Sequence, residues 1–274
     1  MYEKKYGVTI VIPTYNEREN IKILIPLIHE KLKDVCKYEI LIVDDDSPDG
    51  TWKTAKSLAL NYPVRVYRRI NKKGLASAIL DGIARASYEN VIVMDADLQH
   101  PPNILVAMIE ALQKYELVIA SRYVRGGGVE HWSKHRLLIS KVATLLAHIL
   151  LPRTRGICDP MSGYFGLKKW IIRGVKLNVL GYKLLLEIIV KGKYRRVKEI
   201  PYVFKQRIYG ESKLSRNTIL DYVRHLLLLM SQTSRLDMLG LVVLSTAFFV
   251  LVKILLHFLC KLLHISHILS KVLH

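Results

Sequence analysis

Two carboxylates, Asp95 and Asp97, stand one residue apart directly after the apolar run at residues 91–94. Such a run is typical of a buried strand, so the two acids are expected at its carboxyl end. Hard oxygen ligands in that position suit Mg²⁺ or Mn²⁺ bridging the phosphates of a nucleotide. A polar turn after a core strand is the alternative, because Asp-x-Asp is short and common. The neighbouring motifs favour the metal site.

Other side chains that bind ligands follow the remaining apolar runs. Tyr15 and Glu17 come after residues 8–13 and offer an aromatic face and an acceptor for the edge of a base. Asp44 and Asp45 close the run at residues 39–44, and Arg122 follows the run at 117–120. Each group alone would be an ordinary loop residue. Together they accumulate at the ends of predicted strands, as expected of a binding site.

The elements that must position these residues alternate along the first half of the chain. Helical periodicity predicts helices at residues 20–32, 51–60, 74–86 and 103–113, between strands at 8–13, 39–44, 64–67, 91–94 and 117–120. Strict alternation predicts an α/β fold, with a mostly parallel sheet covered by helices on both faces. In such a sheet ligands bind at the carboxyl ends of the strands.

The pattern changes after Arg122. Gly126, Gly127 and Gly128 predict a flexible loop. Residues 133–151 and 217–230 mix leucines with basic residues at helical spacing, which favours helices that lie in a membrane interface over ordinary core helices. Residues 236–260 are apolar enough for one membrane span rather than a core helix, and residues 261–274 predict an amphipathic tail. We therefore predict a catalytic domain at residues 1–232 and a membrane segment at 233–274.

The charge distribution indicates an anionic partner. The net charge is +19, and the segment from Arg122 to Arg224 holds 22 lysines and arginines against 6 acidic residues. Nucleic acid and membrane headgroups both fit this charge. The basic residues lie among leucines, and no nucleic-acid-binding motif is present, so a lipid bilayer is favoured and nucleic acid is not expected. Three widely spaced cysteines indicate neither a zinc site nor a disulfide framework.

Three motifs in order carry a family resemblance. Pro13-Thr-Tyr-Asn-Glu17, Val43-Asp-Asp-Asp-Ser-Pro-Asp-Gly50 and Asp95-Ala-Asp97 resemble those of the inverting nucleotide-sugar transferases of glycosyltransferase family 2, which have the GT-A fold. Further motifs cover the rest of residues 7–230 and resemble the members that transfer mannose from GDP-mannose to dolichyl or another polyprenyl phosphate. These motifs are Ala120-Ser-Arg-Tyr-Val-Arg-Gly-Gly-Gly128, Trp132, His135-Arg136, Asp159-Pro-Met-Ser-Gly163 and Arg207-x-x-Gly-x-Ser-Lys213.

The resemblance implies a role for each matching residue. The donor would be bound at its guanosine end by Pro13, Tyr15, Glu17, Ile42 and Asp44, with Asp45 beside them. Asp95, Ala96, Asp97 and Gln99 would bind the diphosphate and the sugar, with the metal, Mg²⁺ or Mn²⁺, on Asp95, Asp97 and Gln99. The donor phosphates would be bound by Arg122, Lys183, Arg207 and Lys213. The acceptor phosphate would be bound by Arg122, Arg136 and Ser140. Asp95, Asp97 and Arg122 would be the catalytic residues.

The implied chemistry agrees with the residues present. A lipid phosphate is already an anionic nucleophile at neutral pH, so no side-chain base is required. Arginines can position it for in-line attack, and one displacement inverts the anomeric carbon. The resemblance also places the catalytic domain on the cytoplasmic face of a membrane, the cell membrane in a prokaryote or the endoplasmic reticulum in a eukaryote. A UDP-glucose or other hexosyl transferase is the close alternative, and a non-enzymatic basic membrane or nucleic-acid-binding protein is a remote one.

Overall fold

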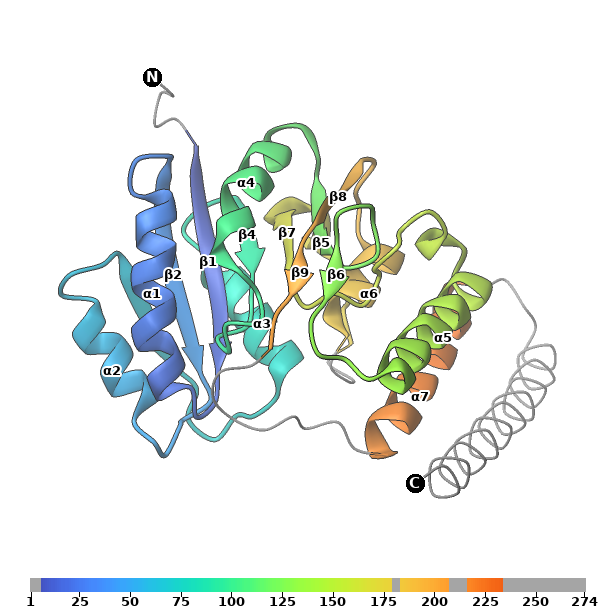
Figure 1. The fold of residues 1–274 in the computed structure, drawn as a ribbon, viewed down its shortest axis with the longest axis horizontal. Helices are drawn as coiled ribbons and strands as arrows, with labels where there is room; N and C mark the ends of the chain where they lie inside the picture. Colours follow the sequence, from blue (N-terminus) through green and yellow to red (C-terminus); the bar gives the residue numbers. More distant parts are fainter. Residues whose placement is uncertain (1–5, 179–182, 207–215, 234–274) are drawn as a thin grey trace, which may run out of the picture. The chain divides into compact units, whose positions relative to one another are not determined.

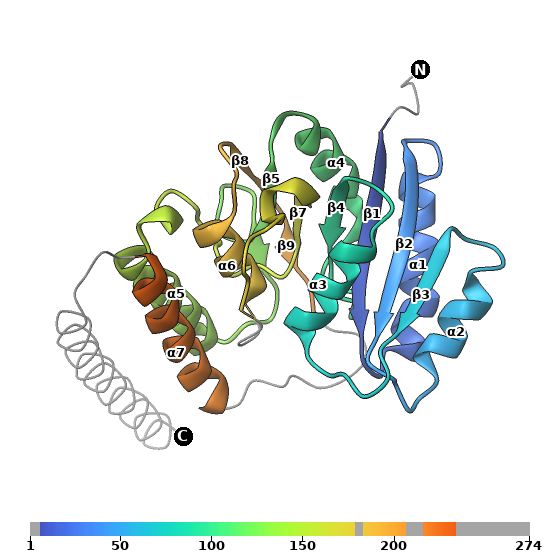
Figure 2. The same cartoon turned by 180° about the vertical axis from the view of Figure 1, so that it is seen from behind.

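The computed structural model describes residues 6–178, 183–206 and 216–233 (Figures 1 and 2). The chain divides into two compact units, residues 1–226 and 227–274, and the fold and site below belong to the first. The predicted span at 236–260, the tail at 261–274, Arg207 and Lys213 lie outside the described residues. No helix within the described ranges has the length and apolar character needed to cross a membrane.

Nine strands and seven α-helices are described. The strands are β1 (Gly7–Thr14), β2 (Lys37–Asp44), β3 (Val64–Arg68), β4 (Asn90–Val93), β5 (Leu117–Ser121), β6 (Gly128–Val129), β7 (Phe165–Lys168), β8 (Val197–Pro201) and β9 (Val203–Phe204). The helices are α1 (Arg18–Leu32), α2 (Thr51–Leu58), α3 (Leu75–Arg85), α4 (Leu105–Lys114), α5 (Lys134–Leu150), α6 (Leu184–Lys191) and α7 (Arg216–Thr233). Each predicted helix and strand of the first half is confirmed, with its ends shifted by a few residues.

The main sheet has seven strands in the order β3-β2-β1-β4-β7-β5-β8. All neighbours are parallel except β7, which runs antiparallel between β4 and β5. The predicted mostly parallel sheet is therefore confirmed, and β7 is an insertion that the alternating pattern did not reveal. β6 and β9 form a separate two-stranded sheet.

The sheet is buried on both faces, as the apolar runs require. Ile10 and Ile12 of β1 join a core beneath α1 and α4, whereas Val11 joins a core beneath α3 and α6. The two views of the ribbon show these helix layers on opposite faces (Figures 1 and 2). Neighbouring side chains on a strand thus fill different cores, and the ends of the parallel strands share one edge, where the predicted site residues gather.

The first part of α7 lies beside α5, where the Tyr222 hydroxyl donates to the carbonyl of Ala143 at 2.7 Å. It is also joined to α6 by a buried hydrogen bond. Glu187, fully buried, accepts from His225 Nε2 at 2.9 Å and from Lys191 Nζ at 2.8 Å. These contacts hold α5, α6 and the start of α7 as one group beside the sheet.

Candidate active site

The two motif carboxylates lie in the turn that follows β4. The backbone N–H of Met94 still donates to Val11, so the parallel pairing ends immediately before Asp95. The side chain of Asp95 is 37% exposed. Asp97 is buried, and its Oδ1 accepts the N–H of Gln99 at 3.1 Å, across Leu98 with φ of +63°. The two carboxylates therefore lie in the turn at the carboxyl end of β4, as predicted.

His100 supports this turn through a hydrogen bond to its backbone and through ring packing. Its Nδ1 accepts the backbone N–H of Asp95 at 2.9 Å, so its own ring proton is on Nε2. The buried ring stacks on Tyr164 with centroids 4.9 Å apart. Gly163 approaches so closely that a Cβ there would stand 3.3 Å from Asp95 Oδ2. His100 is therefore part of the support for the Asp95 backbone.

The donor set at this turn fits a hard divalent cation. Asp95 and Asp97 supply carboxylates, and the side chain of Gln99, in the same turn, donates through Nε2 to the carbonyl of Lys205. No group of three acidic, histidine or cysteine side chains suited to a metal occurs in the described part of the chain. Mg²⁺ commonly uses one or two carboxylates and completes its shell with substrate phosphates and water. Two carboxylates at the end of β4, one partly exposed and one buried, meet that requirement.

Tyr15, Glu17, Asp44 and Asp45 gather at the ends of β1 and β2, at the same edge. Asp44 is fully buried and accepts from the hydroxyls of Thr14 at 2.8 Å and Ser47 at 2.7 Å. Its carboxylate thereby links the end of β1 to the turn that follows β2. Pro13 and Ile42 lie within β1 and β2, and their side chains are buried. They could therefore contact a ligand only through backbone atoms. Ala96 is buried as well.

Arg69, which the sequence did not single out, lies next to this group. It follows β3 directly and is the largest fully buried side chain of the described residues. Its guanidinium lies 3.1 Å from Asp45 Oδ1 and 3.2 Å from Asp81 Oδ2. Burial raises the pKa of Asp45 above its ordinary value, and the nearby carboxylates of Asp44 and Asp81 add to that rise. The Arg69 guanidinium thus offsets the negative charge of both Asp45 and Asp81.

Arg122 lies at the end of β5 and is held by Asp159. Nε and Nη2 of Arg122 each donate to one Asp159 oxygen at 2.7 Å, and its backbone N–H donates to the same carboxylate at 3.0 Å. Asp159 is fully buried, and its own N–H donates to Glu199 at 3.0 Å. Burial alone would lower the pKa of Arg122, but the Asp159 pair raises it above the ordinary value. The guanidinium is permanently charged and fixed in orientation.

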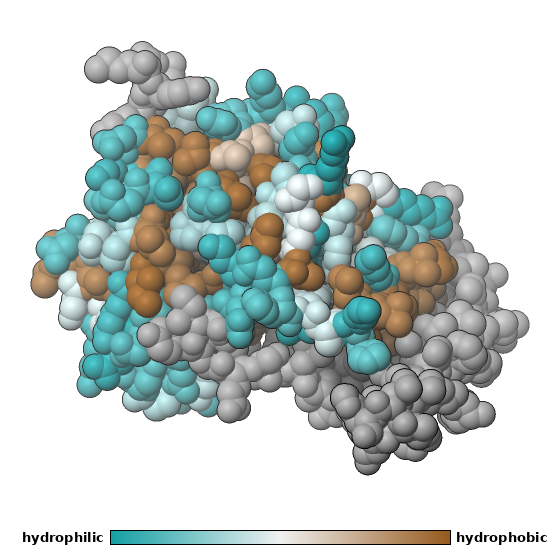
Figure 3. Space-filling model, in the orientation of Figure 1, coloured by the Kyte–Doolittle hydropathy of each residue, from teal (hydrophilic) through white to brown (hydrophobic). Residues whose placement is uncertain are grey.

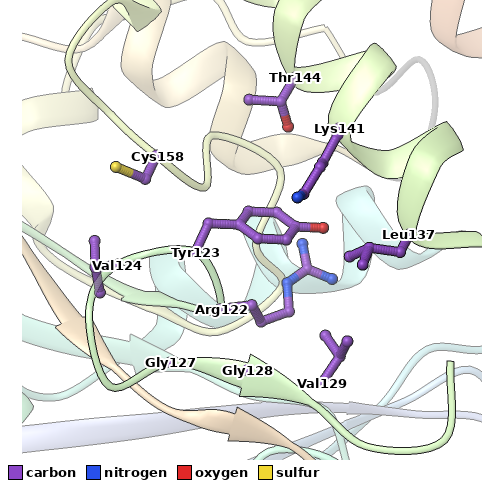
Figure 4. A pocket seen from close by; sticks show the side chains of 10 residues that line it. All are labelled: Arg122, Tyr123, Val124, Gly127, Gly128, Val129, Leu137, Lys141, Thr144 and Cys158. Carbon is purple, nitrogen blue, oxygen red and sulfur yellow. The ribbon is translucent and has the colours of Figure 1, made fainter. Parts of the chain in front are cut away.

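A cavity of about 400 Å³ opens beside Arg122. Arg122 and Lys141 of α5 both point into it, with apolar walls beside them (Figure 4). The predicted flexible glycine loop forms part of its wall and is packed, because a Cβ on Gly127 would come within 2.6 Å of the Ser121 carbonyl. Two cations in a partly apolar hollow are suited to a phosphate that carries a hydrocarbon chain. The lining residues are Arg122, Tyr123, Val124, Gly127, Gly128, Val129, Leu137, Lys141, Thr144 and Cys158.

The other residues predicted for the acceptor phosphate lie on α5. Arg136 is in the first turn, with its guanidinium 4.2 Å from the Trp132 ring centroid. The Ser140 hydroxyl accepts from the hydroxyl of Tyr123 at 2.7 Å. Tyr123 lines the cavity, so Ser140 is linked to it through that ring. Neither Arg136 nor Ser140 lines the cavity itself.

Lys183 precedes α6 and lies near the same charges. Burial, and then the positive charge of Arg122, lower the pKa of Lys183 to about 8, although Asp159 and Asp95 oppose this. Its Nζ is 3.5 Å from the Met161 carbonyl. The structure therefore brings the acids at the ends of β1 and β2, the Asp95 turn, Arg122 and Lys183 to one edge.

Sequence reasoning missed three residues of this region. The carboxylate of Asp159 binds Arg122, a contact that its motif does not indicate. Neither Arg69 nor Lys141 is singled out by the sequence, where Lys141 is one of the basic residues of the predicted helix at 133–151. The sequence signal for Asp159 was its place in the Asp-Pro-Met-Ser-Gly motif, but an arginine buried among acids has no local signature.

Comparisons with known proteins agree with this geometry. Residues 9–168 match the glycosyl transferase family 2. A dolichol-phosphate mannosyltransferase of Pyrococcus furiosus is 49% identical over 231 residues, 84% of this chain and 65% of that one. A dolichol-phosphate mannosyltransferase of Saccharomyces cerevisiae is 35% identical over 230 residues, 80% of this chain and 85% of that one. The chain thus spans less than two thirds of the length of the Pyrococcus protein.

Solved structures give the fold. Glucosyl-3-phosphoglycerate synthase from Mycobacterium tuberculosis, in complex with Mn²⁺, UDP and glucosyl-3-phosphoglycerate, has a TM-score of 0.61 at 17% identity. The match covers 85% of this chain and 82% of that one. This establishes the GT-A-like arrangement of the sheet and its helices. By the family match and the mannosyltransferase relatives, this chain belongs to glycosyltransferase family 2 and, within it, to the dolichol-phosphate mannosyltransferase family.

Proposed function

We propose that this protein transfers mannose, with inversion, from GDP-mannose to dolichyl or another polyprenyl phosphate at a membrane surface. The names of its relatives support the reaction. The observation that carries the acceptor side is the cavity beside Arg122, where a fixed guanidinium and Lys141 meet apolar walls. That combination suits the phosphate end of a lipid better than a soluble sugar, because part of its lining is apolar.

The residues present can manage the charges of the reaction. The guanidinium edge of Arg122 that binds Asp159 is occupied, so Nη1 and the remaining Nη2 proton are left to donate to the acceptor phosphate. A phosphate oxygen attacks the anomeric carbon, and the bond to the nucleoside diphosphate breaks on the opposite face. Because the nucleophile is already an anion, no proton has to be removed. The side chains act by orientation and charge.

Asp95, Asp97 and Gln99 are proposed to hold Mg²⁺ or Mn²⁺. When bound, the metal supplies positive charge that offsets the charge developing on the leaving diphosphate. The related Mycobacterium synthase is bound to Mn²⁺ or Mg²⁺ together with UDP, which supports a divalent ion at this turn. Tyr15, Glu17, Asp44 and Asp45 are proposed to surround the guanosine, with Pro13, Ile42 and Ala96 offering backbone atoms. Arg207 and Lys213 remain predicted donor-phosphate ligands.

Lys183 gives the proposed donor site a pH dependence. Its pKa of about 8 means that roughly half of the free protein is neutral there at about pH 8. A bound diphosphate raises that pKa, so binding takes up protons, and the affinity for GDP is expected to fall between about pH 7 and pH 9. Calorimetry in buffers of different ionisation enthalpy measures the uptake. Lys183→Arg stays charged over this range, so the Lys183 contribution to uptake should vanish; an unchanged uptake would separate Lys183 from the donor phosphates.

The α5 surface is proposed to contact lipid headgroups. Leu138, Ile139, Leu145 and Ile149 are 44%, 43%, 57% and 56% exposed, and hydrophobic side chains are visible in the region of α5 (Figure 3). A basic helix with an exposed apolar side is typical of an interfacial helix. We therefore predict that Leu145→Gln/Ile149→Gln raises the KM for a long polyprenyl phosphate in anionic vesicles by about tenfold. The reason is that two apolar side chains would no longer be buried in the lipid.

The control is Leu60→Gln, because Leu60 is 86% exposed but lies beyond α2. It should leave the KM unchanged. The double variant should also keep its KM for a short acceptor in detergent, where no bilayer surface is involved. If both variants behave alike in vesicles, α5 is not the lipid-binding surface.

The reaction itself is tested with a donor screen. Purified full-length protein in detergent is given labelled GDP-mannose, UDP-glucose and UDP-N-acetylglucosamine with one polyprenyl phosphate. Transfer from GDP-mannose, with loss on adding chelator, is the expected result. Transfer from a UDP-sugar in its place would establish the alternative hexosyl transferase and overturn the proposed donor.

A further inference from the structure

Arg69 occupies an unusual position for an arginine. Its side chain is 1% exposed, and it lies among groups from three segments of the chain. Nη1 donates to the Gly74 carbonyl at 3.2 Å, and Nη2 donates to the Ser77 hydroxyl at 2.6 Å. Asp45 and Asp81 supply the opposing charges. A guanidinium out of water is costly unless it is paired on several sides, so this one is held strongly in one geometry.

Arg69 connects two parts of the donor side. Its backbone N–H donates to the Asp44 carbonyl at 2.7 Å, at the exit of β2. Gly74 is bound twice, because its carbonyl accepts from Arg69 and its N–H donates to Asp45 Oδ2 at 2.8 Å. Residues 70–73 between them form an exposed loop. Both ends of this loop are therefore fixed to the same buried Arg69–Asp45 pair.

The loop reaches the aromatic residue of the donor side. Lys73 Nζ lies 5.3 Å from the ring centroid of Tyr15, and Tyr15 is 36% exposed. Nearby, Asp45 Oδ1 is buried and has no hydrogen-bond partner among the described residues, although Arg69 Nη1 is 3.1 Å away, so Asp45 acts by anchoring the loop through Gly74. The aromatic face of Tyr15 and the ammonium group of Lys73 thus lie together. An aromatic ring can stack on a base, and an ammonium group can donate to the acceptor atoms of that base.

We propose that Arg69 is a positioning residue for recognition of the donor base, acting by holding Asp45 and the 70–73 loop, with Lys73, against Tyr15. This rests on the proposed function, and it adds a cause of nucleotide preference. Guanine offers a lysine two adjacent acceptors, O6 and N7, whereas the two carbonyls of uracil are separated by its N–H. An ammonium group held beside an aromatic face favours the first pattern, and it does so only while both stay in register.

The test compares binding of GDP and UDP, each with Mn²⁺, to full-length protein by calorimetry. Arg69→Lys keeps the charge but loses the fork that holds Gly74 and Ser77 together. We expect its GDP affinity to fall about tenfold and its UDP affinity by less than about threefold, because hydrogen bonds that select one base depend on accurately placed partners. A general loss of folding would lower both affinities equally, so the ratio distinguishes positioning from damage.

Two matched controls come from this chain. Arg65→Lys changes another arginine of β3 that is paired with a buried carboxylate, Glu39, at 2.9 Å, and it should leave the GDP to UDP ratio unchanged. Lys73→Ala should lower the ratio without a change in thermal stability, because the loop is exposed, whereas the adjacent Lys72→Ala should not lower it.

The outcomes separate the two hypotheses. If Arg69→Lys and Lys73→Ala both retain the wild-type ratio, the positioning role is wrong. If the wild type itself binds UDP more tightly than GDP, the proposed donor is wrong, and the positioning role is then decided by whether Arg69→Lys changes that ratio. If Arg69→Lys does not fold, Lys73→Ala against Lys72→Ala decides the question alone.

Discussion

Replacing Asp97 by alanine is expected to lower kcat by about a thousandfold, which corresponds to losing several kcal/mol of charge stabilisation by the metal. The fold should survive. Asp97 accepts a hydrogen bond from the N–H of Gln99, and a bond of this kind contributes about 1 kcal/mol. Steady-state rates with saturating GDP-mannose and lipid phosphate measure the first effect, and thermal unfolding measures the second.

Asp97→Asn is the matched variant. The amide oxygen can still accept from Gln99, but the negative charge is gone, so activity should remain low while stability returns to the wild-type value. Chelator should inactivate the parent protein, and Mg²⁺ or Mn²⁺ should restore it. Full activity in excess chelator would exclude the metal assignment at this turn.

The second large effect is expected at Arg122. Arg122→Lys keeps a positive charge beside the buried Asp159, so the protein should fold. Lysine cannot reproduce the two parallel contacts of 2.7 Å that fix the guanidinium. Misplacing the group that orients the acceptor phosphate should lower kcat by about a hundredfold. The affinity for GDP-mannose should change by much less, since this residue is assigned to the acceptor.

Calorimetry of the sugar nucleotide and lipid-dependent rates separate these two quantities. Arg125→Lys serves as the control, because Arg125 is an exposed residue of the same loop and does not line the cavity. Equal losses of GDP-mannose binding and of turnover in Arg122→Lys would assign Arg122 to the donor and would contradict the proposed division of roles.

The alternating half of the fold could be predicted because its signals are local. Each apolar run from residues 8 to 120 is followed by a turn and a periodic helix, and period and order are enough to give a parallel sheet. β7 was missed because its four residues, Phe165–Lys168, do not alternate between apolar and polar types. They include a glycine and a lysine, which are uncommon in buried strands. It pairs with strands far away in sequence, and only that pairing makes it a strand.

The site was predictable where residue type alone indicates a role. Acids after a buried strand, as at Asp95, are unusual enough to be noticed. The opposite holds for Arg69 and Asp159, whose roles depend on partners from remote segments. Arginine is normally a solvated residue, so nothing in the sequence around Arg69 predicts that it is buried. Likewise, the contact of Tyr123 with Ser140 comes from the packing of α5 beside the β5 exit.

The antiparallel β7 also has a consequence for how the chain is made. Strands β1 to β4 pair among themselves within residues 7–93, whereas β5 pairs only with β7 and β8. During synthesis the first four strands can therefore assemble early, but the outer edge of β4 has no partner until β7 emerges. At ribosomal speed, synthesis from the end of β4 to the end of β7 takes on the order of ten seconds. Over that interval β4 is an open sheet edge, the kind of surface on which nascent chains aggregate, so this protein should depend on chaperones most while its second half is being translated.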